Sequence, residues 1–170
     1  MMKKTAVIPI LLLFFALFSN DAAAAGYMKF DGVDGESKNS QFEGFSDLQC
    51  WTYGIEIPTS QRSGRATGKR QHRPFTVTKP LDKASPLLMK KCITGEVIRN
   101  AKIEYTRTND DGREESYYTV ELTNVRIVSY NIDCDDDTGA TIEDITLSFE
   151  KIKVTYANSQ VEFTDNWEFE

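Results

Sequence analysis

Most of the chain alternates apolar and polar residues with the two-residue period of a β-strand. Residues 101–106 alternate in this way, and residues 118–123 repeat the pattern after the turn sequence NDDG at 109–112. Two alternating runs joined by a glycine-containing turn predict a β-hairpin. Residues 48–57, rich in aromatic and β-branched side chains, and residues 75–77 predict further strands.

The apolar positions change parity close to residue 150. They are odd-numbered over residues 145–149 and even-numbered over residues 152–156. Because strand side chains change face at every residue, we expect one extra residue, a β-bulge, near Glu150 and Lys151. A strand buried on both faces would give the same pattern.

Residues 81–95 instead carry apolar residues at helical spacing. Asp82 or Ser85 can cap a helix, Pro86 fits its first turn, and Gly95 can adopt the left-handed conformation that ends it. The pairs four residues apart, which share a helix face, are Leu88 with Cys92 and Met89 with Ile93. The chain therefore predicts a mainly β fold with one short helix.

The N-terminus has the layout of a secretory signal peptide. Lys3 and Lys4 precede the uncharged, apolar residues 5–18, and a run of alanines ends at Ala25. This apolar run of 14 residues is shorter than the roughly 20 that a membrane-spanning helix needs. We therefore expect residues 1–25 to be a signal peptide rather than a stable membrane anchor, cleaved before Gly26 or one residue earlier.

Residues 26–170 are then expected to form a single domain. A chain of this length buries about two-thirds of its unfolded surface, which suffices for a core without disulfides. The net charge of the full chain, −6, argues against nucleic acid and anionic membranes as partners. The three cysteines, Cys50, Cys92 and Cys134, allow one internal disulfide at most, and three buried thiols are the favoured alternative.

Two charged segments are candidates for function. The acidic turn contains Asp133, Asp135, Asp136 and Asp137. With Asp144 its spacing approaches that of a calcium loop, but Gly139 occupies position 7 instead of 6 and strands flank it, so we expect a solvated turn and no metal site. The basic loop, residues 58–73, contains Arg62, Arg65, Lys69, Arg70, His72 and Arg73, and it has no acidic residue.

Neither segment predicts catalysis. Gly64 and Gly68 enclose three residues instead of the four of a phosphate-binding loop, and Arg70 stands where a magnesium-binding Ser or Thr would be. His72 is the only histidine, and no nucleophile is placed beside it by the sequence. We expect no enzyme and no cofactor.

Four segments together resemble the haemolysin-coregulated protein (Hcp) family, the tube subunits of type VI secretion systems. They are YMKFDGVDGESK (27–38), TGKRQHRPFTVTKPLDKASPLLMKKCITG (67–95), YYTVELTNVRIVSY (117–130) and EDITLSFEKIKVTYA (143–157). The resemblance covers residues 27–169 and implies a two-sheet β-barrel or sandwich with one helix packed on its side.

The resemblance also implies a function without catalysis. Family members form hexameric rings that stack into a tube, which carries effector proteins, is topped by a spike protein and leaves the cell. The family's loop that contacts neighbouring rings corresponds to the basic loop, so we expect it to stack against the acidic turn of the next ring.

The N-terminus departs from the family, because a tube subunit is loaded from the cytoplasm and needs no cleaved signal. Two alternatives follow. One is a secreted tube subunit made in the cytoplasm, with Met28 as an internal start. The other is an exported, stand-alone Hcp-like binding protein of the periplasm or the extracellular space, which would pass through the periplasm by way of its signal peptide.

Overall fold

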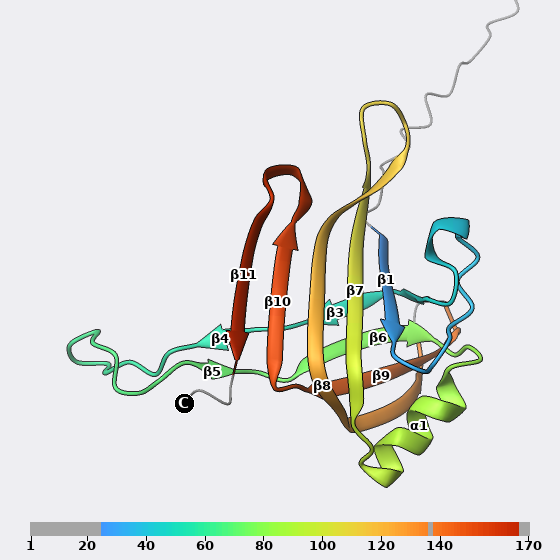
Figure 1. Ribbon diagram of the computed structural model, residues 1–170. Coiled ribbons are helices and arrows are strands. Elements are labelled where there is room, and N and C mark those ends of the chain that lie inside the picture. Colours follow the sequence, from blue (N-terminus) through green and yellow to red (C-terminus); the bar gives the residue numbers. More distant parts are fainter. Residues whose placement is uncertain (1–24, 136–137, 167–170) are drawn as a thin grey trace, which may run out of the picture.

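The computed structural model describes residues 25–135 and 138–166 of the chain. It is mainly β with one α-helix, as the sequence predicts (Figure 1). The helix is α1 (Ser85–Thr94), and two short 3-10 helices are η1 (Ser40–Phe42) and η2 (Ala157–Ser159). The strands are β1 (Ala25–Phe30), β2 (Ser46–Leu48), β3 (Cys50–Thr52), β4 (Ile55–Glu56), β5 (Gln71–His72), β6 (Phe75–Pro80), β7 (Ile98–Thr108), β8 (Glu114–Cys134), β9 (Thr141–Ser148), β10 (Lys151–Tyr156) and β11 (Val161–Asn166).

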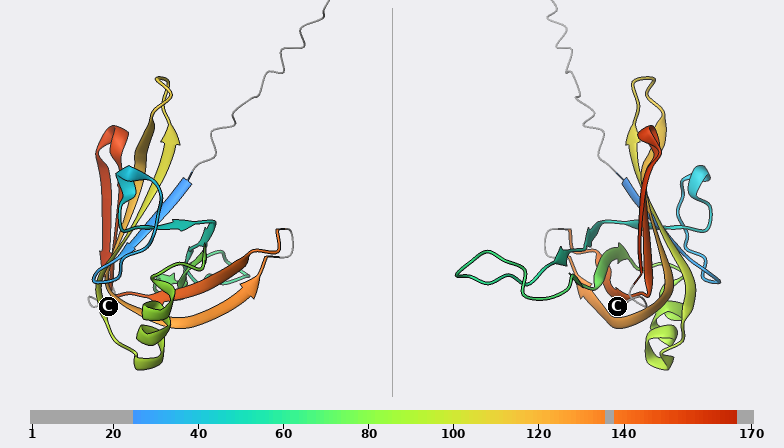
Figure 2. Two further views of the ribbon diagram at one scale, coloured as in Figure 1. Left: turned by 90° about the vertical axis from the view of Figure 1, so that its right-hand side faces the viewer. Right: turned by 60° about the vertical axis from the view of Figure 1, so that its left-hand side comes forward.

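Two antiparallel layers share the long strand β8. One layer has the order β2–β1–β7–β8–β10–β11, and the other has the order β8–β9–β6–β3. Figure 2 shows the layers meeting where β8 bends, with α1 below them. The predicted two-sheet arrangement with a helix on its side is thus confirmed.

The sheet does not close into a barrel, so that part of the prediction is wrong. Its hydrogen-bonded order ends at β2 on one side and at β3 on the other. These two short strands are separated in the chain by Gln49 alone, whose amide donates to the Thr78 carbonyl at 2.9 Å. Because β2 and β3 follow one another end to end, they cannot pair side by side, and among the described strands no hydrogen-bonded ladder closes the two edges.

The change of parity near residue 150 is confirmed, but its cause differs from the predicted bulge. The buried positions pass from Phe149 to Ile152 across the break between β9 and β10, and from Leu122 to Val125 in β8, which lies opposite. The pairing register is the same on both sides of this point. Both strands therefore change face together, and Asn124, with a φ of 52°, makes the bend in β8.

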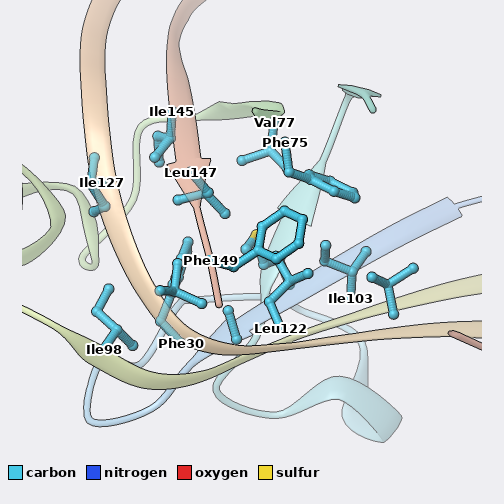
Figure 3. Packing of buried hydrophobic residues seen from close by; sticks show 14 of the residues in the cluster. Phe30, Phe75, Val77, Ile98, Ile103, Leu122, Ile127, Ile145, Leu147 and Phe149 are labelled. Carbon is cyan, nitrogen blue, oxygen red and sulfur yellow. The ribbon is translucent and has the colours of Figure 1, made fainter. Parts of the chain in front are cut away.

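The core lies between the layers and draws on both of them (Figure 3). Side chains that are at most 1% exposed include Phe30, Phe75, Ile103, Leu122 and Leu147. Each lies on the inward face of its strand, as the two-residue period requires. At about 25 cal/mol for each Å² of apolar surface removed from water, such a core is the main source of stability.

Helix α1 forms within the predicted segment, with Pro86 in the first turn and Gly95 at the left-handed stop, where φ is 66°. Its N-cap is Ala84, which makes no side-chain cap bond, so the cap predicted at Asp82 or Ser85 is wrong.

The two apolar pairs of the helix lie in different environments. Leu88 is fully buried and Cys92 packs against the core, but the pair Met89 and Ile93 faces solvent. The helix therefore keeps one apolar pair outside the core of its own chain. Among the described residues, no helix is long and apolar enough to cross a membrane.

A buried polar network fastens α1 to the sheet, and the sequence reading did not anticipate it. The Lys79 ammonium lies 2.6 Å from Glu143 and 2.9 Å from Asp82, and the side chains of Lys79 and Glu143 are fully buried. Ser85 donates to Glu143 at 3.0 Å, and the Tyr130 hydroxyl also donates to it. A buried charge needs such partners, because removing an unpaired ion from water costs on the order of several kcal/mol.

Candidate functional site

An extended hairpin, residues 54–73, projects from the body of the molecule, and we call it the arm (Figure 1). β4 and β5 pair at its base, where the Arg73 amide donates to the Gly54 carbonyl at 2.8 Å. Towards the tip, the Ser60 amide donates to the Arg65 carbonyl at 2.8 Å, and Gly64 adopts a φ of 67°. Backbone hydrogen bonds therefore shape the arm along its whole length.

The base of the arm is bound to the last strand. Arg70 donates to both carboxylate oxygens of Asp165, at 2.5 and 2.6 Å, and His72 Nε2 lies 3.1 Å from the same carboxylate. His72 Nδ1 is in turn 2.5 Å from the Tyr53 hydroxyl. The bonds from Arg70 lower the pKa of Asp165, and burial raises the pKa of Tyr53 to about 12. This ionic contact fixes the arm to β11.

The six predicted stacking residues thus divide into two groups. Arg70 and His72 serve the internal contact with β11, and Arg73 pairs with Glu56 across the hairpin at 2.6 Å. The other three are exposed, and none of them has an ion-pair partner among the described residues. We call these three the arm tip: Arg62, Arg65 and Lys69.

The acidic turn joins β8 to β9 and points in a different direction from the arm (Figures 1 and 2). Asp133 is exposed near the end of β8, and Asp135 accepts the amide of Thr138 at 2.8 Å. Asp136 and Asp137 lie outside the described residues. The turn and the arm tip are therefore separate surfaces of opposite charge.

Other candidates from the sequence are dispersed. In the described part of the chain, no three His, Cys, Asp or Glu side chains gather as a metal site. His72 is the one candidate base, and it lies at the base of the arm. The hydroxyl of Ser85, a possible nucleophile by residue type, donates instead to Glu143 at the start of α1. All three cysteines are free thiols.

The expectation that all three thiols are buried is wrong for two of them. Cys50 and Cys134 are exposed, and Cys92 is partly buried. Cys50 sits on β3 at the edge of its sheet, and Cys134 ends β8 beside the acidic turn. Both cysteines therefore lie at the margin of the sheet, where neighbouring strands shield them less from solvent.

The predicted cleavage site lies at the beginning of β1. Ala25 pairs with Thr106, and Gly26 pairs with Tyr105. Gly26 is buried, and a Cβ added there would come within 3.1 Å of the Trp51 ring. The residues on both sides of the predicted cut are therefore part of the folded sheet.

Comparisons with known proteins agree with this architecture. Residues 27–156 match the family model described as type VI secretion system effector, Hcp. The chain belongs to the Hcp family. It is 35% identical over 138 residues to the major exported protein of Pseudomonas aeruginosa, which covers 76% of this chain and 80% of that protein.

Solved Hcp structures share the fold. A tryptophan-substituted variant of Hcp1 from E. coli EAEC 042 is 30% identical, with a TM-score of 0.77 over 86% of this chain and 99% of that one. The secreted protein Hcp3 from Pseudomonas aeruginosa is 26% identical, with a TM-score of 0.73 over 85% and 99%. The two-layer sheet, the arm and α1 are thus set within a family of known architecture.

Proposed function

We propose that this Hcp protein is a structural subunit of a type VI secretion tube. Six copies close into a ring, the rings stack, and the tube carries effector proteins behind a spike protein. The subunit itself is secreted, as the relative named major exported protein is. The role needs no catalysis and no cofactor, and it uses neither nucleic acid nor a membrane anchor.

The observation that carries the proposal is the exposed apolar surface along the arm and β11. Ile55 and Ile57 on the arm are 51% and 55% exposed, and Val161 and Phe163 on β11 are 62% and 60% exposed. Single exposed apolar residues are ordinary, but several on adjoining elements favour contact with another protein chain. A projecting arm that leaves its apolar residues in solvent is suited to reach a second copy.

Electron microscopy of the purified chain tests this proposal. Rings of six are the expected result, and the double variant I55D/I57D should reduce them to monomers while leaving the far-ultraviolet circular dichroism unchanged. The matched control places the same two charges at exposed apolar positions elsewhere, on α1, as M89D/I93D. Monomers of the unaltered protein at all concentrations would contradict the proposal.

We further propose that ring stacking is directed by charge. The arm tip carries three positive charges, and the acidic turn carries aspartates at 133 and 135–137. In a head-to-tail stack two different surfaces meet, so opposite charges on them favour one orientation and oppose the reverse one. This assigns the stacking role to Arg62, Arg65 and Lys69 and removes Arg70 from it, because Arg70 is held by Asp165.

The N-terminal layout favours a second candidate, an exported Hcp-like binding protein that acts alone in the periplasm or the extracellular space. The two functions differ in where the chain is found and in what form. A tube subunit is present uncut in the cytoplasm and in the same form in the medium. A stand-alone protein is cut near Ala25 and stays monomeric after export, which intact mass and microscopy of each fraction distinguish.

A further inference from the structure

An aromatic cavity opens between the two layers at the end away from α1. Its volume is about 560 Å³, which is within the usual range of small-molecule sites, roughly 300–1,000 Å³. The floor is made of buried side chains, namely Phe75, Tyr105, Val120 and Ile152. The walls are partly buried, and they include Trp51, Tyr53, Tyr117, Tyr118 and Val154.

The lining carries no charge, although the chain as a whole is rich in charged residues. None of the side chains around the cavity is an acid, a lysine or an arginine. An ion entering it would lose its hydration without gaining a partner, which is costly. The cavity therefore favours an uncharged occupant.

Aromatic residues of the lining also carry polar groups. Among the described residues, none makes a hydrogen bond to the hydroxyls of Tyr105 or Tyr118 or to the indole N–H of Trp51. Burial raises the pKa of Tyr105, so its hydroxyl stays protonated and can donate. A few polar groups on an apolar, aromatic wall are the composition that orients a bound ring compound.

We infer that this cavity is a binding site for a small, uncharged, ring-containing molecule that stacks on the aromatic wall and accepts a hydrogen bond. Trp51 is held in place by two contacts. Its ring lies 4.3 Å from the ring of Tyr105, between centroids, and it packs over Gly26, where no larger residue fits without displacing it. The site includes neither the arm tip nor the acidic turn.

Two dyes of the same aromatic frame test the inference on the intact chain. N-phenyl-1-naphthylamine is neutral, and 8-anilinonaphthalene-1-sulfonate differs from it by one sulfonate charge. We expect the neutral dye to bind once per chain and at least tenfold more tightly than the anionic one. Equal affinities would indicate general apolar surface and would overturn the inference.

A matched pair of variants locates the site. Val154 lines the cavity on β10, whereas Val128 on β8 is exposed outside it. V154W should fill the cavity and weaken the neutral dye at least tenfold, and V128W should leave its affinity unchanged. If V154W does not fold, T52W fills the same cavity from an exposed position on its rim.

Two outcomes would overturn this assignment. One is undiminished binding of the neutral dye to folded V154W and T52W. The other is binding by single chains that disappears when rings form, because the cavity would then be a contact surface between copies. Dye titration of both fractions from size-exclusion chromatography separates these outcomes from the expected one.

Discussion

Arg70 donates two hydrogen bonds to Asp165, at 2.5 and 2.6 Å, and this pair joins the base of the arm to β11. The Asp165 side chain is only 13% exposed, so the contact is shielded from water more than a surface ion pair is. The pair holds the direction in which the arm leaves the molecule. A substitution of Arg70 is therefore expected to alter the position of the arm within a single chain, apart from any effect on the proposed stacking.

The first prediction concerns stability. D165N should lower the free energy of unfolding by about 1–3 kcal/mol, because it leaves Arg70 and His72 without their carboxylate partner. The control is E56Q, which breaks the solvent-exposed pair with Arg73 and should cost about 0–1 kcal/mol. Urea denaturation followed by circular dichroism measures both, and equal effects would show that the Asp165 contact stabilises the fold no more than a solvent-exposed ion pair does.

The same pair predicts a dependence on pH. Because the bonds from Arg70 hold the pKa of Asp165 below its ordinary value of 3.8, the carboxylate binds protons more weakly in the folded chain. Its stabilising contribution is therefore complete above pH 3.8 and is lost as the pH falls through the lower, folded pKa. The stability difference between the unaltered protein and D165N should shrink over that acid range, and a constant difference would contradict this cause.

The second prediction concerns stacking. R62E/R65E reverses two charges at the arm tip and should abolish tubes while rings persist, since neither side chain packs on its own chain. K83E/K90E makes the same change of net charge at exposed lysines near and on α1, and tubes should survive it. D133K should restore tubes in the R62E/R65E background. Electron microscopy at low and high salt is the measurement, and unchanged tubes in R62E/R65E would refute the charge model.

The third prediction concerns the buried network. K79M should lower the free energy of unfolding by about 3–5 kcal/mol, because it leaves the fully buried Glu143 without its ammonium partner. K83M, at an exposed position, should change it by less than about 0.5 kcal/mol. The double variant K79M/E143M should recover part of the loss, because it removes both charges from the core. Denaturant titrations of the unaltered protein and the three variants measure these differences, and equal losses in K79M and K83M would contradict the prediction.

Much of the fold follows from periodicity and local signals. The helix stop at Gly95 and Pro86 in the first turn were predictable, because they depend on backbone geometry within a few residues. Periodicity even contained a signal for the buried network. Lys79 shares the odd-numbered inward face with Phe75 and Val77, and Glu143 shares one with Ile145 and Leu147. Two opposite charges on adjacent inward faces indicate a buried pair.

The rest depends on contacts between distant residues. Arg70 and Asp165 are 95 residues apart, and nothing local to either one distinguishes a bound arginine from the exposed Arg62 or Arg65. The sequence therefore grouped the basic residues as one surface, and the structure divides them. The aromatic cavity was hidden for the same reason, because its walls come from strands that are far apart in the chain.

The last prediction concerns where an exported chain begins. A cut after Ala25 would leave the new ammonium group on Gly26, which is buried in β1. A start at Met28 would also remove Tyr27, whose ring stacks on Phe42 at 4.0 Å and whose hydroxyl donates to Glu114 at 3.0 Å. A start at Ala25 preserves all of β1 and places the ammonium at a partly exposed residue.

We therefore expect intact-mass measurement of the periplasm and medium to find a chain that begins at Ala25, if the signal peptide is used. Chains prepared with starts at 25, 26 and 28 should melt in that order, the first at the highest temperature, because an ammonium group is costly to bury. A native chain that begins at Gly26 and melts as high as the Ala25 form would contradict this reasoning. An uncut chain in both the cytoplasm and the medium would instead favour the tube subunit.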